Sequence, residues 1–182
     1  MTADAAPAVV PSPPPLPPAE LEREVTAFLH HEAELLDDRR FEEWLALFAP
    51  GATYEAPLRV TREFQAESEL SATGRIFWDD RDTLAIRVQR LRSEYAWAEQ
   101  PASRTRHFVT NIRVATMDGR AVSARANLLV YRSRGDDPRA DLYSADRRDV
   151  LVRDAEGRLL ISRRWLGLDQ SNLTGNSLSI FL

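Results

Sequence analysis

The stretch PASRTRHFVTNIRV, residues 101–114, alternates between two sets of side chains from Arg104 onward. Alternation with a period of two predicts a half-buried strand, because successive side chains leave a pleated backbone on opposite faces. One face of this strand is expected to carry Arg104, Arg106, Phe108, Ile112 and Val114. The opposite face is expected to carry Thr105, His107, Asn111 and Arg113. The chain therefore contains a long strand that begins just after Pro101, where a missing amide hydrogen disrupts no ladder.

Patterns on either side of this strand divide the chain into helices first and strands afterwards. Further runs of strand character follow it, at about residues 122–131, 142–153 and 158–168. Apolar residues recur with helical spacing before it, and predict helices at 20–36, 39–49 and about 79–93. Two short strands are expected at 52–56 and 74–78, a loop at 58–73, and a hairpin turn at Asp118-Gly119. This order predicts an α+β domain with helices covering one face of a curved antiparallel sheet.

Residues 1–18 are rich in alanine and proline and have a different character from the rest. Closely spaced prolines prevent both a helix and a place inside a sheet, so this segment is expected to be a disordered tail. Residues 19–182 are expected to form a single domain.

The composition excludes several classes of function. The chain has 182 residues and no cysteine, so it offers no disulfide, thiolate cluster ligand or cysteine nucleophile. A net charge of −4 argues against a nucleic-acid partner, which needs a basic face. No apolar run approaches the roughly 20 residues of a membrane helix, and the N-terminus does not resemble a signal peptide.

Several motifs, in order along the chain, resemble one family. AELLDDRRFEEWL at 33–45, RVQRL at 87–91 and AWAEQPASRTRH at 96–107 look like segments of the β (small) subunits of aromatic-ring-hydroxylating dioxygenases. The resemblance continues through NIRV at 111–114, LVYRSR at 129–134, RRDVL at 147–151 and LDQ at 168–170. It runs from about residue 20 to the end, and it implies the cone-shaped NTF2-like (cystatin-like) fold.

The resemblance also implies cofactors, partners and a location. In this family the α (large) subunit carries a Rieske [2Fe-2S] cluster and a mononuclear Fe(II), and this chain is expected to hold no cofactor. Its partners would be the α subunit and other copies of itself in an α3β3 hexamer in the bacterial cytoplasm. That oxygenase would cis-dihydroxylate an aromatic compound with O2 and electrons from NAD(P)H. Benzoate-like acids, biphenyls and polycyclic compounds all remain open as substrates.

The residues support the absence of a metal site independently. The histidines are His30, His31 and His107, and the first two are adjacent on a predicted helix, so their side chains diverge by about 100°. One helix cannot bring both to one metal.

Two alternatives remain open. The chain could be a stand-alone NTF2-like dehydratase, isomerase or cyclase, with an acid or base inside the cone. Candidate residues are His31 with Asp38, Tyr54 and His107, although the alternation predicts that His107 points away from the interior. The chain could also be an NTF2-like module that binds a small molecule without chemistry.

A sheet face that carries arginine, asparagine and tyrosine suits a subunit interface, where arginine and aromatic residues are enriched. We expect this face and the apolar C-terminus to contact neighbouring subunits. The candidates are Arg104, Arg106, Asn111, Arg113, Asn127, Tyr131, Arg132, Arg147, Phe181 and Leu182.

Overall fold

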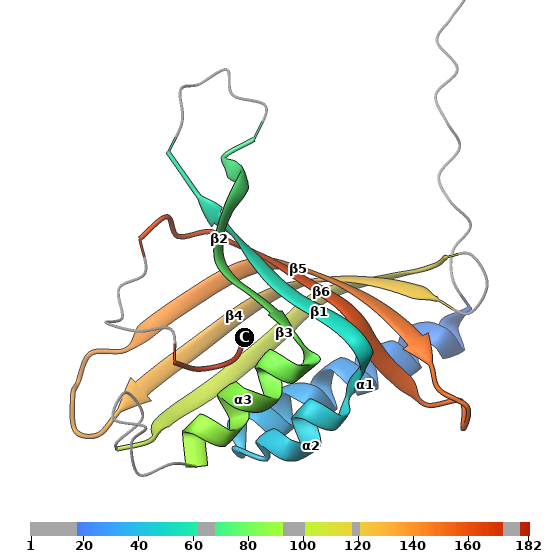
Figure 1. The fold of residues 1–182 in the computed structure, drawn as a ribbon, viewed down its shortest axis with the longest axis horizontal. Helices are drawn as coiled ribbons and strands as arrows, with labels where there is room; N and C mark the ends of the chain where they lie inside the picture. Colours follow the sequence, from blue (N-terminus) through green and yellow to red (C-terminus); the bar gives the residue numbers. More distant parts are fainter. Residues whose placement is uncertain (1–17, 62–67, 93–100, 118–120, 173–178) are drawn as a thin grey trace, which may run out of the picture.

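The computed structural model describes residues 18–61, 68–92, 101–117, 121–172 and 179–182 (Figure 1). The predicted tail before residue 18 and the predicted Asp118-Gly119 turn lie outside these residues. The helices are α1 (Ala19–Asp37), α2 (Phe41–Ala46) and α3 (Arg81–Arg92). The strands are β1 (Phe48–Arg59), β2 (Leu70–Asp80), β3 (Ser103–Thr116), β4 (Val122–Arg134), β5 (Asp141–Arg153) and β6 (Leu159–Leu168). None of these helices is long and apolar enough to cross a membrane.

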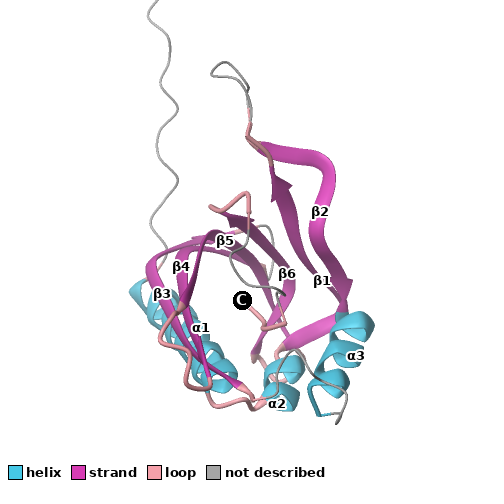
Figure 2. Ribbon diagram, turned by 90° about the vertical axis from the view of Figure 1, so that its left-hand side faces the viewer, coloured by secondary structure: helices cyan, strands magenta, loops and turns pink. Residues whose placement is uncertain are grey.

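The strands form one six-stranded sheet in the order β2-β1-β6-β5-β4-β3. All neighbouring strands are antiparallel except β1 and β6, which are parallel. The sheet is strongly curved, and the helices lie on its concave side (Figures 1 and 2). We call this concave side the inner face and the opposite side the outer face. This arrangement confirms the α+β class predicted from the sequence.

The core fills the space between the inner face and the helices. On β4 the predicted alternation is confirmed, because Val122, Ala124, Ala126, Leu128 and Val130 are all buried. Helix α1 contributes apolar side chains at helical spacing. An aromatic cluster continues the core below β1, with Trp44, Phe48, Tyr54 and Phe181 as its members.

The sequence prediction for residues 39–59 was wrong in its boundaries. The predicted helix at 39–49 is one short helix, α2, and β1 already begins at Phe48. Pro50-Gly51 does not end a helix but lies inside β1, where the register with β6 shifts between Phe48 and Thr53. Gly51 has a φ of 73°, a conformation that glycine adopts without steric cost. The bulge therefore absorbs the turn-forming pair without ending the strand.

The prediction of which β3 side chains face inward was also wrong, because the strand contains a bulge. Between Thr110 and Arg113 the register with β4 shifts, and Asn111 takes a φ of 52°. The bulge adds one residue, so a single alternation cannot describe the whole strand. Val114 after the bulge faces inward as predicted, but Phe108 before it is 51% exposed on the outer face. His107 accordingly points inward, not outward.

Candidate functional site

His107 lies on the inner face of β3, where it contacts the last residue of α1. Its Nδ1 is 2.6 Å from Oδ1 of Asp37, and its backbone N–H donates to Oδ2 of the same carboxylate at 3.1 Å. The hydroxyl of Thr105 also donates to Asp37, at 3.1 Å. Burial raises the pKa of Asp37, but the bonds and charge of His107, together with Thr105, hold that pKa below its ordinary value. Asp37 therefore ties the end of α1 to β3 as a carboxylate.

The C-terminal residues occupy the interior of the curved sheet, as the position of the C-terminus in Figure 2 indicates. The N–H of Leu182 donates to the Tyr54 hydroxyl at 3.0 Å, and that hydroxyl donates back to the Leu182 oxygen at 3.1 Å. The main-chain oxygen of Phe181 lies 3.2 Å from Nε2 of His107. The chain's own end is thus bonded to two of the residues that the sequence proposed as acid or base.

A small cavity of about 80 Å³ adjoins Phe181 on the inner face. Its lining includes the polar side chains of Thr105 and His107 and the apolar side chains of Leu36, Phe41 and Phe181. The interior therefore contains a polar corner beside an apolar space.

The four residues proposed for pocket catalysis do not come together as one site. His31 is exposed on α1, where its Nδ1 is 3.4 Å from Glu34, and Asp38 is exposed at the end of the same helix. Tyr54 and His107 both reach the interior, and burial raises the pKa of the Tyr54 hydroxyl. The carboxylate that partners His107 is Asp37, which the sequence analysis did not select.

A buried group of four charges is the largest feature that the sequence analysis missed. Glu32 on α1 pairs with Arg147 and Arg164, and both arginines also pair with Asp149. Trp44 donates its indole N–H to Glu32 at 2.9 Å. Burial raises the pKa of Glu32, but the charges of the two arginines dominate and hold it at about 2. The sequence did contain a sign of this buried group. Glu32 falls at helical spacing with Val25, Leu29 and Leu36, on the apolar face of α1.

The donor set of the chain does not fit either redox centre of a ring-hydroxylating oxygenase. A Rieske cluster needs two cysteines and two histidines, and the sequence has no cysteine. Of the histidines, His30 and His31 are exposed on α1, whereas His107 is bonded to Asp37 on the inner face. Across the described residues, histidine, aspartate and glutamate nowhere form a group of three that could hold a metal ion.

The outer face of the sheet carries an exposed apolar patch. The strand register places Phe108 opposite Leu129, and Tyr131 opposite Leu142, on neighbouring rows of β3, β4 and β5. Each of these four side chains is at least 40% exposed. We call these four residues the apolar patch. Large apolar side chains gathered on one exposed face are typical of an interaction surface.

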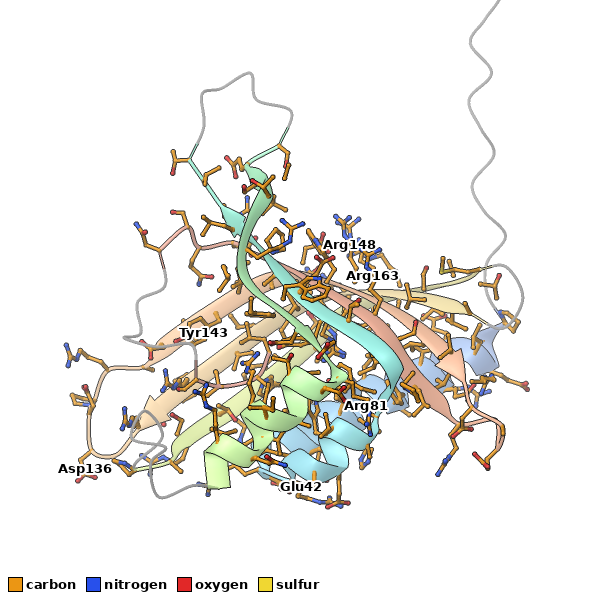
Figure 3. The ribbon with its side chains drawn as sticks, viewed as in Figure 1. Glu42, Arg81, Asp136, Tyr143, Arg148 and Arg163 are labelled. Carbon is orange, nitrogen blue, oxygen red and sulfur yellow. The ribbon has the colours of Figure 1, made fainter. Side chains whose placement is uncertain are left out.

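A second feature of the outer face is a row of residues that crosses the whole sheet. Successive pairings align Arg113, Arg125, Arg148, Trp165, Glu55 and Trp78. We call these six residues the arginine–tryptophan row. The guanidinium of Arg148 lies 4.5 Å from the centre of the Trp165 ring. In Figure 3, Arg148 and Arg163 lie on the side of the sheet away from the helices.

Carboxylates along this row are outnumbered by arginines. Asp146 accepts from both Arg125 and Arg148, with distances of 2.8 to 3.1 Å. Glu55 pairs with Arg163 at 2.9 Å and with Arg75 at 3.4 Å. The row is therefore a locally positive strip on a protein whose net charge is −4.

The ten interface candidates separate into two groups. Arg147, Arg132, Phe181 and Leu182 are buried inside this chain, so their side chains offer little surface to a neighbour. The other six are exposed along β3 and β4, and they are Arg104, Arg106, Asn111, Arg113, Asn127 and Tyr131. The sequence analysis did not select Phe108, Leu129 or Leu142. Phe108 was assigned to the wrong face because of the bulge in β3, whereas the regular alternation of β4 already placed Leu129 on the outer face.

Comparison with known proteins places the chain in a family. A profile of the family described as "Ring hydroxylating beta subunit" matches residues 31–175. The chain is 40% identical over 175 residues to chlorobenzene dioxygenase subunit beta of Cupriavidus sp. (strain PS12), covering 93% of this chain and 92% of the relative. It is 33% identical over 176 residues to biphenyl 2,3-dioxygenase subunit beta of Rhodococcus jostii (strain RHA1), with the same coverage of both.

A solved structure supports the fold. A chain of naphthalene 1,2-dioxygenase, with indole bound in the active site of that enzyme, superposes with a TM-score of 0.82 at 24% identity. The match covers 91% of this chain and 87% of the other. The curved sheet with its helices therefore has the same fold as that chain. The chain belongs to the family of ring-hydroxylating dioxygenase β subunits, as the motifs predicted.

Proposed function

We propose that this chain is the scaffolding β subunit of a terminal oxygenase that cis-dihydroxylates an aromatic compound. In this proposal it assembles with a large α subunit as an α3β3 hexamer in the bacterial cytoplasm. The names of the curated relatives, which are subunits of chlorobenzene and biphenyl dioxygenases, support an aromatic substrate. O2 and electrons from NAD(P)H would be consumed by the whole assembly.

The α subunit is proposed to hold the Rieske [2Fe-2S] cluster and the mononuclear Fe(II). The chemistry of the donors supports this division, because this chain has no cysteine and its histidines do not converge. The chain's own contribution is a rigid sheet that presents a contact surface to neighbouring subunits.

The observation that carries the proposal is the apolar patch beside the arginine–tryptophan row. Subunit interfaces combine a desolvated apolar centre with aromatic and arginine side chains. Here both parts lie on the sheet face opposite the three helices that the structure describes (Figure 1), and the positive row suits an acidic surface on a partner. Of the six exposed candidates, Tyr131 belongs to the apolar patch and Arg113 to the row, and the other four lie on the same two strands, β3 and β4.

The test is co-expression of this chain with the large α subunit of its oxygenase. Phe108→Asp places a charge in the centre of the apolar patch, and we expect at least a tenfold loss of the co-purified complex and of dioxygenase turnover. Ile86→Asp is the matched control, because Ile86 is 57% exposed on α3, away from the patch. The control should assemble as the unaltered chain does.

Circular dichroism separates a lost interface from a lost fold. Phe108→Asp should keep its spectrum and melt within a few degrees of the unaltered chain, since Phe108 is already half exposed. Full assembly of a folded Phe108→Asp variant would refute the outer face as the contact surface. Turnover by this chain without its partner would refute the scaffolding role.

A further inference from the structure

Inside the curved sheet, the aromatic ring of the chain's own Phe181 occupies a site lined by other side chains. We propose that this interior is a binding site for a small planar aromatic molecule carrying a hydrogen-bond acceptor, and that Ser179–Leu182 occupies it in this structure. The inference is independent of the assembly proposed above, because the inner face lies away from the outer contact surface.

Three groups hold the ring of Phe181. The ring of Trp44 lies 4.2 Å away, centre to centre, with a tilt of 32° between the planes. Phe41 meets Phe181 edge-on at 5.8 Å, and the guanidinium of Arg87 lies 4.7 Å from its centre. Stacking, an edge contact and a cation over the face are the ways in which proteins recognise an aromatic ring.

Polar groups beside the ring recognise the main chain of the segment as they would recognise a ligand. Nε2 of His107 faces the Phe181 oxygen at 3.2 Å, and the Tyr54 hydroxyl bonds to the N–H and oxygen of Leu182. Nδ1 of His107 is held by Asp37 at 2.6 Å, so the ring is fixed with Nε2 toward the interior. An acceptor on an aromatic ligand would meet the same two side chains.

The occupying segment belongs to no helix or strand. The main chain of Phe181 and Leu182 is bonded to side chains of the wall, and Ser179 accepts from Arg132 at 3.2 Å. The segment can therefore leave without breaking the ladder of the sheet. The cavity of about 80 Å³ beside Phe181 shows that the segment does not fill the interior completely.

The experiment uses the full chain with Phe181→Ala, which removes the ring and leaves the walls. The probes are acetophenone, which has a carbonyl acceptor, and ethylbenzene, which has a similar shape and no acceptor. Calorimetry should show acetophenone binding about tenfold tighter than ethylbenzene, the effect of about one good hydrogen bond. The unaltered chain should bind acetophenone at least a hundredfold more weakly, since its own segment competes for the site.

Two further variants test the polar wall. Adding either His107→Leu or Tyr54→Phe to Phe181→Ala should reduce the preference for acetophenone, and circular dichroism selects the variants that are folded. If Phe181→Ala itself does not fold, Phe181→Leu replaces it, because leucine keeps an apolar side chain and still removes the ring.

Three results would overturn the proposal. The first is a folded variant that binds neither probe. The second is equal affinity for the two probes, or a preference that the wall variants leave unchanged, because either describes a plain apolar cavity. The third is equally tight binding by the unaltered chain, which would place the site elsewhere.

Discussion

Glu32 and Arg164 form an ion pair in the interior, and neither side chain has any exposure to solvent. Nη2 of Arg164 donates to Oε2 of Glu32 at 2.9 Å, and Nε of Arg164 donates to Asp149 at 2.9 Å. With Arg147, the group contains two cations and two anions, so its formal charge is zero. The pair joins helix α1 to strand β6 across the core, and it fixes how the helix lies on the sheet.

Replacing Glu32 should therefore be costly. Glu32→Gln leaves two buried arginines with Asp149 as their one remaining carboxylate in the group, and breaking a buried pair in this way typically costs about 3 to 5 kcal/mol. Urea unfolding followed by circular dichroism measures the change in the free energy of unfolding. Glu34→Gln, on the exposed side of the same helix, is the control and should change it by less than about 0.5 kcal/mol. Similar values for the two variants would mean that the buried pair does not stabilise the fold.

The same group predicts a pH dependence. Glu32 has a pKa of about 2 in the folded chain against an ordinary value of 4.5. A lowered pKa means that the unfolded chain takes up the proton first, so the stabilisation is complete above about pH 4.5 and is lost as the pH falls toward 2. The loss is about 3 kcal/mol, at about 1.4 kcal/mol for each pH unit.

Urea unfolding at a series of pH values from 7 to 2 measures this loss. In Glu32→Gln the decline with acid should be shallower, because the residue no longer titrates, whereas other carboxylates such as Asp37 still contribute. Parallel declines in the two proteins would assign the acid sensitivity to other groups.

The elements that could be predicted from the sequence are those with a local, periodic pattern of apolar residues. The buried residues of β4 and the stripe of α1 follow directly from spacing, because each side chain's position depends on its own strand or helix. The faces of β3 could not be predicted in the same way. The bulge at Asn111 depends on pairing with β4, and the sequence before and after it gives two alternations of opposite phase.

The candidate site likewise has features that the sequence could predict and features that it could not. Of the residues selected from the sequence, Tyr54 and His107 reach the interior. The sequence analysis paired Asp38 with His31, whereas the structure brings the neighbouring Asp37 to His107. Asp37 is the last residue of α1, and the chain leaves the helix through Arg39 at a φ of 59°. Which of two adjacent acids faces inward depends on where the helix ends, and a helix end is the least certain part of a sequence prediction.

These two adjacent acids provide a matched pair of variants. Asp37→Asn weakens the bonds from Thr105 and from the ring and backbone of His107, and should cost about 2 kcal/mol of unfolding free energy. Asp38→Asn changes an exposed carboxylate and should be nearly neutral. Thermal unfolding by circular dichroism distinguishes them. A larger loss for Asp38→Asn would contradict the assignment of Asp37 as the partner of His107.

On the outer face, a double-mutant cycle can measure the interaction between Trp165 and Gly167. A Cβ atom on Gly167 would lie 2.6 Å from the Trp165 ring, so Gly167→Ala must push the indole away from its place beside Arg148. We expect a loss of about 1 kcal/mol in the unfolding free energy, from the displaced ring and its weakened cation–π contact. In a Trp165→Leu background the same Gly167→Ala change should be nearly neutral, because no ring remains to be displaced. Urea unfolding of the four proteins gives the coupling energy, and additive effects of the two changes would show that the ring does not rest on the glycine.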